Sequence, residues 1–291
     1  MQAANEGNLT EAVIARLANC GDARFKRVMT SLIRHLHAFV REVELTEPEW
    51  LAAIQFLTAT GRKCDDRRQE FILLSDVLGV SMLVDDINHG HSEGATETTV
   101  FGPFFREGAP DLPMGADIAA GVAGEPTWIA GRVADTAGRP LAGAIIDVWA
   151  VDGDGLYDAQ RTDSDAMRVR GRFRTGPDGR YAFRTVRPVG YSVPTDGPVG
   201  TMLDRMKRHA MRPAHVHFMI QAPGYDPLIT HLFVAGSEHL DSDAVFGVKN
   251  SLVTDFALHP PGIAPDGSRV EVPWYTAEFD FGLKRVGEGR A

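Results

Sequence analysis

Cysteine is almost absent from this chain of 291 residues, which contains only Cys20 and Cys64. Both lie in sequence with a helical pattern, and they do not form a pair with the spacing of a metal site. This scarcity argues against a disulfide framework and against a cysteine-based zinc site, and it fits a reducing cytoplasm.

Long apolar runs and an excess of basic charge are missing too. No apolar run approaches the roughly 20 residues that span a membrane, and the first residues show no basic stretch followed by an apolar signal core. The 30 Lys and Arg are outnumbered by 39 Asp and Glu, so the net charge of −9 argues against general nucleic-acid binding. No Walker, dinucleotide or Gly-x-Ser-x-Gly motif occurs. We therefore expect a cytoplasmic protein with no membrane span and no nucleic-acid partner.

Helical patterns fill the first ninety residues. Apolar residues recur at three-to-four spacing over 25–44, and the segment from Thr46 to Glu49 is a capping box that predicts the start of another helix. Residues 67–89 predict one further helix, which is apolar around most of its girth. Such a helix should be largely buried, against its neighbours or against a partner chain.

Strand patterns begin at residue 128, after a segment (92–126) rich in Gly, Pro and Ala. Side chains alternate on both sides of Asp178-Gly179, which predicts a hairpin because the glycine supplies the positive φ of its turn. About eight strands are expected, at 129–135, 141–152, the two arms of 171–186, 213–222, 228–236, 251–258 and 269–283. The pattern predicts an α+β chain with a helical N-terminal domain over 1–105 and an antiparallel β-sandwich or barrel over 106–291.

The sharpest local feature is the pair His215 and His217 in a predicted strand. Residues two apart point to the same face, so both imidazoles can reach one point, and imidazole is a common ligand of iron, zinc and copper. A strand can equally carry two surface histidines without a metal. Residues 218–224 contain no acid, so the Glu of a cupin-like ferrous site is missing.

Two tyrosines, Tyr157 and Tyr191, lie in loops beside Gly and Pro. A tyrosine in such a loop more often packs or caps than binds a metal. A phenolate is nevertheless a hard anionic donor, and two phenolates with two imidazoles would hold iron in its ferric state. The acidic turn Asp152-Gly-Asp154 lacks the later ligands of a calcium loop. The basic run 205–212 is expected to be a solvated loop, apart from Arg212.

Four segments follow one another in a specific order: 141–149 leads into 155–158, and 191–194 and 212–217 follow. The spacing of their Tyr, Tyr, Arg, His and His residues resembles that of the intradiol ring-cleaving dioxygenases, non-haem ferric enzymes of aromatic catabolism. The resemblance also includes Gly102-Pro-Phe and the helical part, so it covers nearly the whole chain.

The resemblance implies a role for each of these side chains. Tyr191 would be the phenolate that leaves the metal and takes up a proton when substrate arrives, and Arg212 would stabilise charge that develops on the substrate. The ligands of Fe(III) would be Tyr157, Tyr191, His215 and His217.

The segments 64–84, 95–104 and 228–233 look most like the family members that cleave hydroxyquinol (1,2,4-trihydroxybenzene). Relatives that cleave catechol usually carry Gln at the position of His231. We expect His231 to bind the substrate. The implied reaction uses O2 and gives 3-hydroxy-cis,cis-muconate, which tautomerises to maleylacetate; cleavage of catechol or chlorocatechol is the alternative. A different class stays open, because 131–144 also resembles transthyretin-like sandwich modules that only bind or stiffen.

The family places an apolar substrate pocket above the iron. Asp86 is our candidate for the residue that binds the third hydroxyl of hydroxyquinol, although an aspartate at a helix end can equally face water. Family members also dimerise through the helical domain and often hold a phospholipid in a tunnel there, so a homodimer with such a lipid is implied. By position, the pocket wall would include Leu83, Asp86, Val100, Phe101, Gly102, Pro103, Phe104, Val193 and Pro194.

Overall fold

The computed structural model describes residues 7–65, 68–90, 92–161 and 166–287. The chain divides into two compact units, one ending at Ala59 and the other beginning at Thr60. The division into functional domains that we expect at residue 105 stays a prediction. Among the described residues, no helix is both long and apolar enough to cross a membrane.

The first unit is helical. Asp22 caps the second of its helices by accepting a hydrogen bond from the Phe25 N–H at 2.9 Å. The predicted helix after Thr46 is confirmed, and Glu49 Oε2 accepts from the Thr46 N–H at 2.9 Å. The unit consists of α1 (Leu9–Ala15), α2 (Ala23–Glu42) and most of α3 (Glu47–Arg62).

The single helix predicted over 67–89 is wrong, because two helices occupy this stretch: α4 (Glu70–Val77) and α5 (Val80–His89). Gly79 separates them with a left-handed backbone (φ 72°), which a continuous helix cannot accommodate. Residue 67, the predicted start, lies outside the described residues. The expected burial is also incomplete within one chain, since Leu78 and Leu83 are 53% and 61% exposed.

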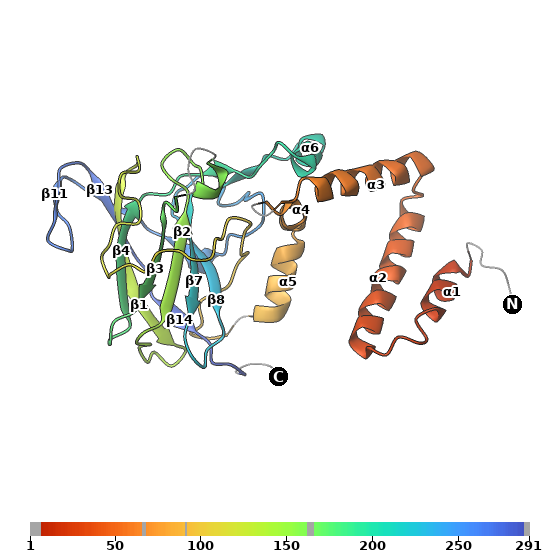
Figure 1. The fold of residues 1–291 in the computed structure, drawn as a ribbon, viewed down its shortest axis with the longest axis horizontal. Coiled ribbons are helices and arrows are strands. Elements are labelled where there is room, and N and C mark those ends of the chain that lie inside the picture. Colours follow the sequence, from red (N-terminus) through yellow and green to blue (C-terminus); the bar gives the residue numbers. More distant parts are fainter. Residues whose placement is uncertain (1–6, 66–67, 91, 162–165, 288–291) are drawn as a thin grey trace. The chain divides into compact units, whose positions relative to one another are not determined.

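The second unit contains two facing sheets of five strands each, which confirms the predicted sandwich (Figure 1). Most neighbouring strands are antiparallel, but β1 runs parallel to β13 and β14, and β8 runs parallel to β9. One sheet holds β1 (Pro126–Asp135), β4 (Arg180–Val186), β10 (Ala257–His259), β13 (Trp274–Glu278) and β14 (Phe281–Leu283). The other has the order β3 (Arg170–Arg174), β2 (Ile145–Ala150), β7 (His215–Gln221), β8 (Leu228–Val234) and β9 (Val253–Thr254).

The hairpin predicted over 171–186 is wrong in its pairing. Gly179 does have a positive φ (75°), and Phe173 and Phe183 are buried as the alternation predicts. However, β3 pairs with β2 in one sheet, whereas β4 pairs with β1 in the other. The Asp178-Gly179 turn therefore carries the chain across the sandwich, and the two arms pack face to face through stacked rings at 5.3 Å.

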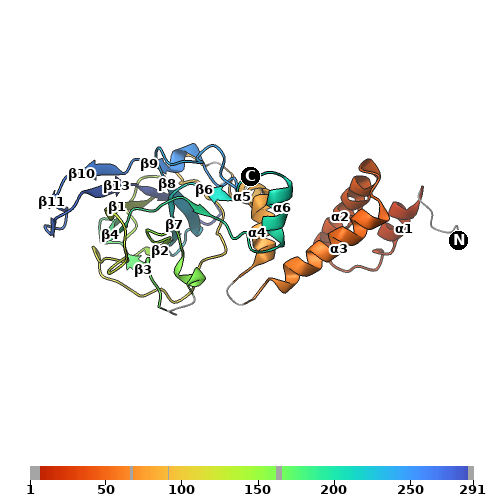
Figure 2. The same ribbon diagram turned by 90° about the horizontal axis from the view of Figure 1, so that it is seen from above.

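Short elements complete the second unit. Figure 2 shows α4, α5 and α6 beside one another at one end of the sandwich. The core between the sheets is formed by the inward side chains of both sheets, with Ile129 and Phe183 from one and Ile146 and Phe218 from the other. The short elements are β5 (Tyr191–Ser192), paired with β6 (Met211–Arg212), β11 (Gly262–Ile263), paired with β12 (Arg269–Val270), α6 (Pro198–Arg205), η1 (Asp158–Gln160) and η2 (Asn250–Leu252).

Candidate metal centre

The candidate site lies on the outer face of the sheet that contains β2, β7 and β8. Alternate residues of β7 face the core, so His215 and His217 point to the outer face. The neighbouring strands place Trp149 and His231 directly opposite His217 in the ladder. All four side chains are buried, because loops and short elements cover this face of the sheet.

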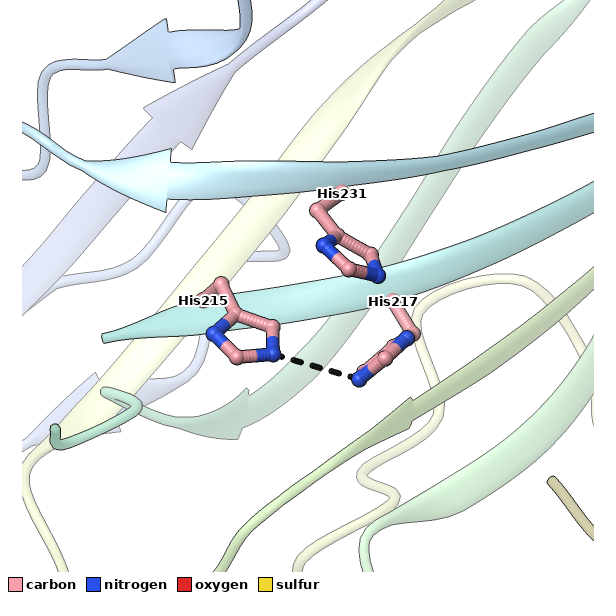
Figure 3. A group of neighbouring side chains, drawn as sticks. All are labelled: His215, His217 and His231. Carbon is pink, nitrogen blue, oxygen red and sulfur yellow. Dashed lines mark hydrogen bonds between the residues drawn. The ribbon is translucent and has the colours of Figure 1, made fainter. Parts of the chain in front are cut away.

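Two tyrosine hydroxyls and two histidine nitrogens meet at this face. Tyr157 Oη lies 2.8 Å from His217 Nε2 and 3.1 Å from Tyr191 Oη. Tyr191 Oη lies 3.5 Å from His215 Nε2, and the two Nε2 atoms are 3.2 Å apart. Figure 3 shows the two imidazoles directed toward each other. The structure thus brings all four predicted ligand side chains together from three separate parts of the chain.

A buried ion pair between Asp158 and Arg170 fixes the backbone next to Tyr157. Tyr157 precedes Asp158, whose carboxylate accepts hydrogen bonds from Arg170 Nε at 2.8 Å. Arg170 also donates through Nη2 to the Phe104 carbonyl at 2.6 Å. Phe104 in turn stacks on the Tyr157 ring with centroids 4.6 Å apart. The turn at Asp152 that leads to Tyr157 is the simple turn that the sequence predicts.

Tyr191 is brought next to Arg212 by the short β5–β6 ladder, in which the two residues are direct partners. Arg212 Nη1 lies 3.4 Å from Tyr191 Oη and 3.2 Å from His215 Nε2. The other side of the guanidinium is bound by Asp243, with Nε to Oδ1 at 3.0 Å and Nη2 to Oδ2 at 3.2 Å. Arg212 is therefore a buried cation in direct contact with two of the four donor groups.

Burial dominates the protonation of these groups. It raises the pKa of Tyr157 well above its ordinary value, and it raises the pKa of Tyr191 although Arg212 opposes the shift. Burial, followed by the positive charge of Arg212, lowers the pKa of His215 to about 3, and burial lowers the pKa of His217 well below its usual range. Both imidazoles are therefore neutral at pH 7, whereas the phenols can ionise only against a strong positive charge.

The donor set fits a single transition-metal ion. Ligand atoms bound at about 2 Å around a tetrahedral centre lie roughly 3.3 Å apart, and the four contacts here span 2.8–3.5 Å. His215 Nδ1 is placed to donate to the Pro213 carbonyl at 2.8 Å, which leaves Nε2 as the nitrogen for the metal. Two phenolates and two neutral imidazoles are a combination of donors that suits iron.

His231 completes a cluster of three buried histidines whose ring nitrogens lie within 4.8 Å of one another. Its ring stacks on that of His215 (centroids 4.7 Å, 25°) and meets that of His217 edge-on (4.0 Å, 73°). Neither ring nitrogen of His231 makes a hydrogen bond of normal geometry with a described residue, although the backbone of Val100 lies nearby. The tyrosine oxygens contact His217 and His215 but make no hydrogen bond with His231 among the described residues, so His231 lies beside the four donor groups.

The loop at 101–104 contributes the predicted pocket residues nearest to the site. Gly102 has a positive φ (76°), and a Cβ there would lie 3.2 Å from His217 Cε1, so the backbone approaches the imidazole closely. Phe101 meets Trp149 edge-on at 5.9 Å, and Trp149 stacks on His217 at 4.7 Å. Pro103 is half-buried in the same loop.

The remaining predicted pocket residues lie in other surroundings. Val100 and Val193 are buried in an apolar cluster with residues of α4, α5 and α6, whereas Pro194 is half-buried and Leu83 is exposed. Asp86 is exposed on α5, and its carboxylate lies 3.0 Å from Lys249 Nζ. Within the described residues, neither Leu83 nor Asp86 makes a hydrogen bond or an ion pair with the four donor groups.

Several residues that shape the site were not predicted as functional from the sequence. Asp243 lies in an irregular loop where neither periodicity nor a motif marks it, and Arg170 reads as an ordinary strand residue. Of these residues Trp149 alone carried a signal, because it lies near the end of the strand that leads toward Tyr157. Arg208, expected in a solvated loop, instead donates to the Val77 carbonyl at 2.6 Å and to the Ala244 carbonyl at 3.0 Å.

Comparison with known families matches almost the entire chain. Residues 22–96 match the family described as the N terminus of catechol dioxygenases, and residues 101–280 match the family described as dioxygenase. The border between these matches falls between residues 96 and 101.

Individual relatives cover nearly the full length of both chains. The 6-chlorohydroxyquinol 1,2-dioxygenase of Cupriavidus pinatubonensis is 53% identical over 97% of this chain and 99% of its own. The crystal structure of hydroxyquinol 1,2-dioxygenase from Pseudomonas putida matches with a TM-score of 0.88 and 52% identity, over 96% of this chain and 98% of its own. Catechol 1,2-dioxygenase from Pseudomonas arvilla matches with a TM-score of 0.82 but only 28% identity, over 96% of this chain and 93% of its own.

Proposed function

The chain belongs to the intradiol ring-cleavage dioxygenases, and we propose that it cleaves hydroxyquinol with O2 between two adjacent hydroxylated carbons. Both oxygen atoms enter the product, 3-hydroxy-cis,cis-muconate, which tautomerises to maleylacetate. The observation that carries this proposal is the convergence of two phenols and two neutral imidazoles beside a buried arginine. The chain is 52–53% identical to relatives named for hydroxyquinol or 6-chlorohydroxyquinol, against 28% and 36% to two named for catechol, which favours hydroxyquinol over catechol.

We infer that Fe(III) is the resident metal, because phenolates are hard anionic donors and buried phenols ionise only next to a strong positive charge. When bound, ferric iron would withdraw electron density from a coordinated aromatic diolate and prepare the ring for reaction with O2. The residues that would hold it are Tyr157, Tyr191, His215 and His217.

The protein side chains have distinct tasks in this reaction. Tyr191 Oη is the group that would receive a substrate proton, because burial raises the pKa of this phenol, although Arg212 opposes the shift. Arg212 Nη1 lies beside Tyr191 Oη and His215 Nε2, so its fixed charge can stabilise negative charge on a bound substrate oxygen. Trp149, stacked on His217, excludes water from one side of the ligand set.

The substrate would bind against the predicted pocket wall. Gly102 supports this position because its backbone passes the His217 ring with no side chain between them. His231 would contact the substrate through a ring nitrogen, and Asp86 would accept a hydrogen bond from the third hydroxyl of the substrate. The apolar part of the wall would be Leu83, Val100, Phe101, Pro103, Phe104, Val193 and Pro194.

The substrate assignment is tested by oxygen uptake with hydroxyquinol, 6-chlorohydroxyquinol, catechol and chlorocatechol, followed by identification of each product. We expect the highest kcat/KM with hydroxyquinol and a product cleaved between the two adjacent hydroxyls. A higher value with catechol or chlorocatechol would favour the alternative substrate. Extradiol products, or no oxygen uptake with any of the four compounds, would remove the proposed function.

The metal assignment is tested by iron analysis and by colour. A protein purified in air with iron supplied should contain about one iron per chain and absorb in the visible, because phenolate-to-ferric charge transfer colours such sites red. Tyr191→Phe should weaken or shift this absorption while the other three ligands remain. A colourless, iron-free protein would instead favour the non-catalytic transthyretin-like module, which needs no convergence of donor groups.

We further propose that the protein acts as a homodimer in the cytoplasm and that the helical region forms the interface and holds a phospholipid. Within one chain the apolar side of α2 is open to solvent, with Leu36 and Phe39 each 52% exposed. Exposed apolar surface on this scale marks a site of association. Cys20 and Cys64 are both free, which fits a reducing compartment.

A further inference from the structure

The buried carboxylate of Asp243 is the strongest contact of Arg212 outside the donor cluster. Asp243 lies 31 residues from Arg212 in sequence and binds it through both carboxylate oxygens, at 3.0 Å to Nε and 3.2 Å to Nη2. Both side chains are almost completely buried, at 4% and 2% exposed. A two-point contact of this kind fixes the plane of the guanidinium as well as its position.

One nitrogen of the guanidinium, Nη1, is directed toward the candidate site. Since Asp243 occupies Nε and Nη2, only Nη1 faces Tyr191 Oη and His215 Nε2, at 3.4 and 3.2 Å. When a metal engages the lone pairs of these two atoms, the N–H groups of Nη1 would remain to stabilise the negative charge that develops on a bound substrate oxygen during the reaction. A rotation of the guanidinium would move Nη1 away from the site, and the two-point contact with the Asp243 carboxylate opposes this rotation.

Asp243 is itself held in place by backbone groups. The N–H of Gly247 donates to Oδ2 at 3.0 Å, and the N–H of Val245 donates to Oδ1 at 3.3 Å. The N–H of Ala244 donates to the Met211 carbonyl at 3.1 Å, which ties this loop to the strand that carries Arg212. The carboxylate thus has no freedom to follow a moving arginine.

Gly247 makes room for this ion pair. A Cβ at this position would lie 3.0 Å from Arg212 Nη2, 3.1 Å from Thr99 Oγ1 and 3.2 Å from Asp243 Oδ2. Thr99 Oγ1 also donates to the Gly247 carbonyl at 3.0 Å, so the loop is closed from that side as well. An added methyl group would therefore press on the arginine and the carboxylate together.

We propose that Asp243 is a positioning residue for the ring-cleavage reaction: it acts only through Arg212, by aiming Nη1 at the substrate. This inference rests on the proposed function. The ionisation of the pair agrees with it, because Arg212 keeps the pKa of Asp243 below its ordinary value although burial opposes the shift.

The test is a double-mutant cycle with Asp243→Asn and Arg212→Lys, measured with hydroxyquinol in the iron-loaded enzyme. The asparagine replaces one acceptor oxygen with an NH2 group that faces the guanidinium, so Nη1 should lose its fixed direction. We expect kcat to fall roughly 10- to 100-fold with little change in KM, the size found when an outer partner of a site residue is removed. In the Arg212→Lys background the same substitution should change kcat less than about threefold, since coupled residues are not additive.

A second readout does not depend on turnover. Under nitrogen, the dissociation constant of hydroxyquinol and the iron content of Asp243→Asn should stay close to those of the wild type, because the ligand set is unchanged. Asp135→Asn is the matched control: Asp135 is also buried, accepts from Arg139 Nε at 2.8 Å and from two backbone N–H groups, and lies on β1 in the other sheet. It should lower the melting temperature without changing kcat.

Gly247→Ala keeps the inference testable if Asp243→Asn fails to fold. It retains every charge and should still lower kcat in a way that disappears in the Arg212→Lys background. Wild-type kcat in Asp243→Asn, or losses that multiply with that of Arg212→Lys, would overturn the inference. A wild-type enzyme that cleaves none of the substrates would instead overturn the proposed function, so the two failures are distinguishable.

Discussion

At the scale of single residues, the chemistry of the site follows from burial. Burial on the covered sheet face raises the pKa of Tyr157, so its phenol ionises less readily. The same burial lowers the pKa of His215 to about 3, so its imidazole is neutral at pH 7. Both could be predicted from the sequence, because residue type, order and spacing identify them. Asp243 could not, since its role depends on a contact across 31 residues that no local pattern encodes.

Asp86→Ala tests the residue proposed to bind the third hydroxyl of the substrate. We expect kcat/KM to fall about 10-fold with hydroxyquinol, which corresponds to one lost hydrogen bond, and to change little with catechol, which lacks that hydroxyl. Steady-state kinetics with both substrates measures the difference. Because Asp86 also contacts Lys249 at 3.0 Å, Lys249→Met is the control for loss of that ion pair alone. Equal losses on both substrates would remove Asp86 from substrate selection.

Asp76, a buried acid on α4, makes the stability of the protein depend on pH. Burial raises its pKa to about 6, although Ser81 and Arg212 oppose the shift. Between about pH 4 and 6 the folded chain then holds a proton that the unfolded chain has lost, so the free energy of unfolding falls as pH rises. Asp76→Asn should remove this effect and be more stable than the wild type at pH 7 by up to about 3 kcal/mol. Urea denaturation at pH 5 and pH 7 measures it, and identical pH profiles for the two proteins would contradict it.

At the scale of elements, the presence of most strands and helices could be predicted from the sequence, but the partner of each strand in the sheets could not. Alternation identified the strands around Gly179 and the side chains that they bury, because a strand facing a core repeats every two residues. The partner of each strand depends on which sheet it joins, and β3 and β4 join different sheets. In the same way, apolar girth predicted helix over 67–89, but the break at Gly79 follows from a backbone conformation that periodicity does not report.

Glu70→Ala tests how one helix holds another near the site. The side chain of Glu70 is fully buried, accepts from the Val199 N–H at the start of α6 at 3.2 Å, and pairs with Arg68 at 2.8 Å. Its loss leaves a buried N–H without an acceptor at the positive end of α6, so we expect the free energy of unfolding to fall by about 1–3 kcal/mol.

Chemical denaturation measures this change, with Glu271→Ala as the control. Glu271 also pairs with an arginine, at 2.7 Å, but both side chains are about 70% exposed. Its removal should cost less than about 1 kcal/mol. A loss from Glu70→Ala as small as that of the control would show that the contact with α6 contributes little.

At the scale of the whole molecule, the two units differ in how much apolar surface they bury. The second unit encloses a continuous core between its sheets. In the first unit, α1 and α2 contain no fully buried residue among those described, and the apolar side of α2 is open. Exposed apolar surface is costly in water, and the proposed dimer and its lipid would cover it.

Leu36→Asp with Phe39→Asp tests that interface. Both side chains are about half exposed in one chain, so the changes should leave the fold intact and convert a dimer to a monomer. Sedimentation equilibrium measures the mass, and Arg27→Asp, on the opposite side of the same helix, is the control that should stay dimeric. A doubly substituted protein with the mass of the wild type would exclude this face as the interface.

Residue types and their spacing were enough to identify the atoms available for the chemistry: two phenols, two imidazoles and one permanent cation, in an order specific enough to identify the family. It also determined the sandwich and the helices ahead of it, since periodicity is a local property of the chain. The folded chain was needed to see that these side chains meet on a buried sheet face, that burial shifts their pKa values, and that Asp243 contacts Arg212 through both carboxylate oxygens. Those properties arise from contacts between residues far apart in the sequence, where free energy depends on distance and solvent exclusion rather than on residue type.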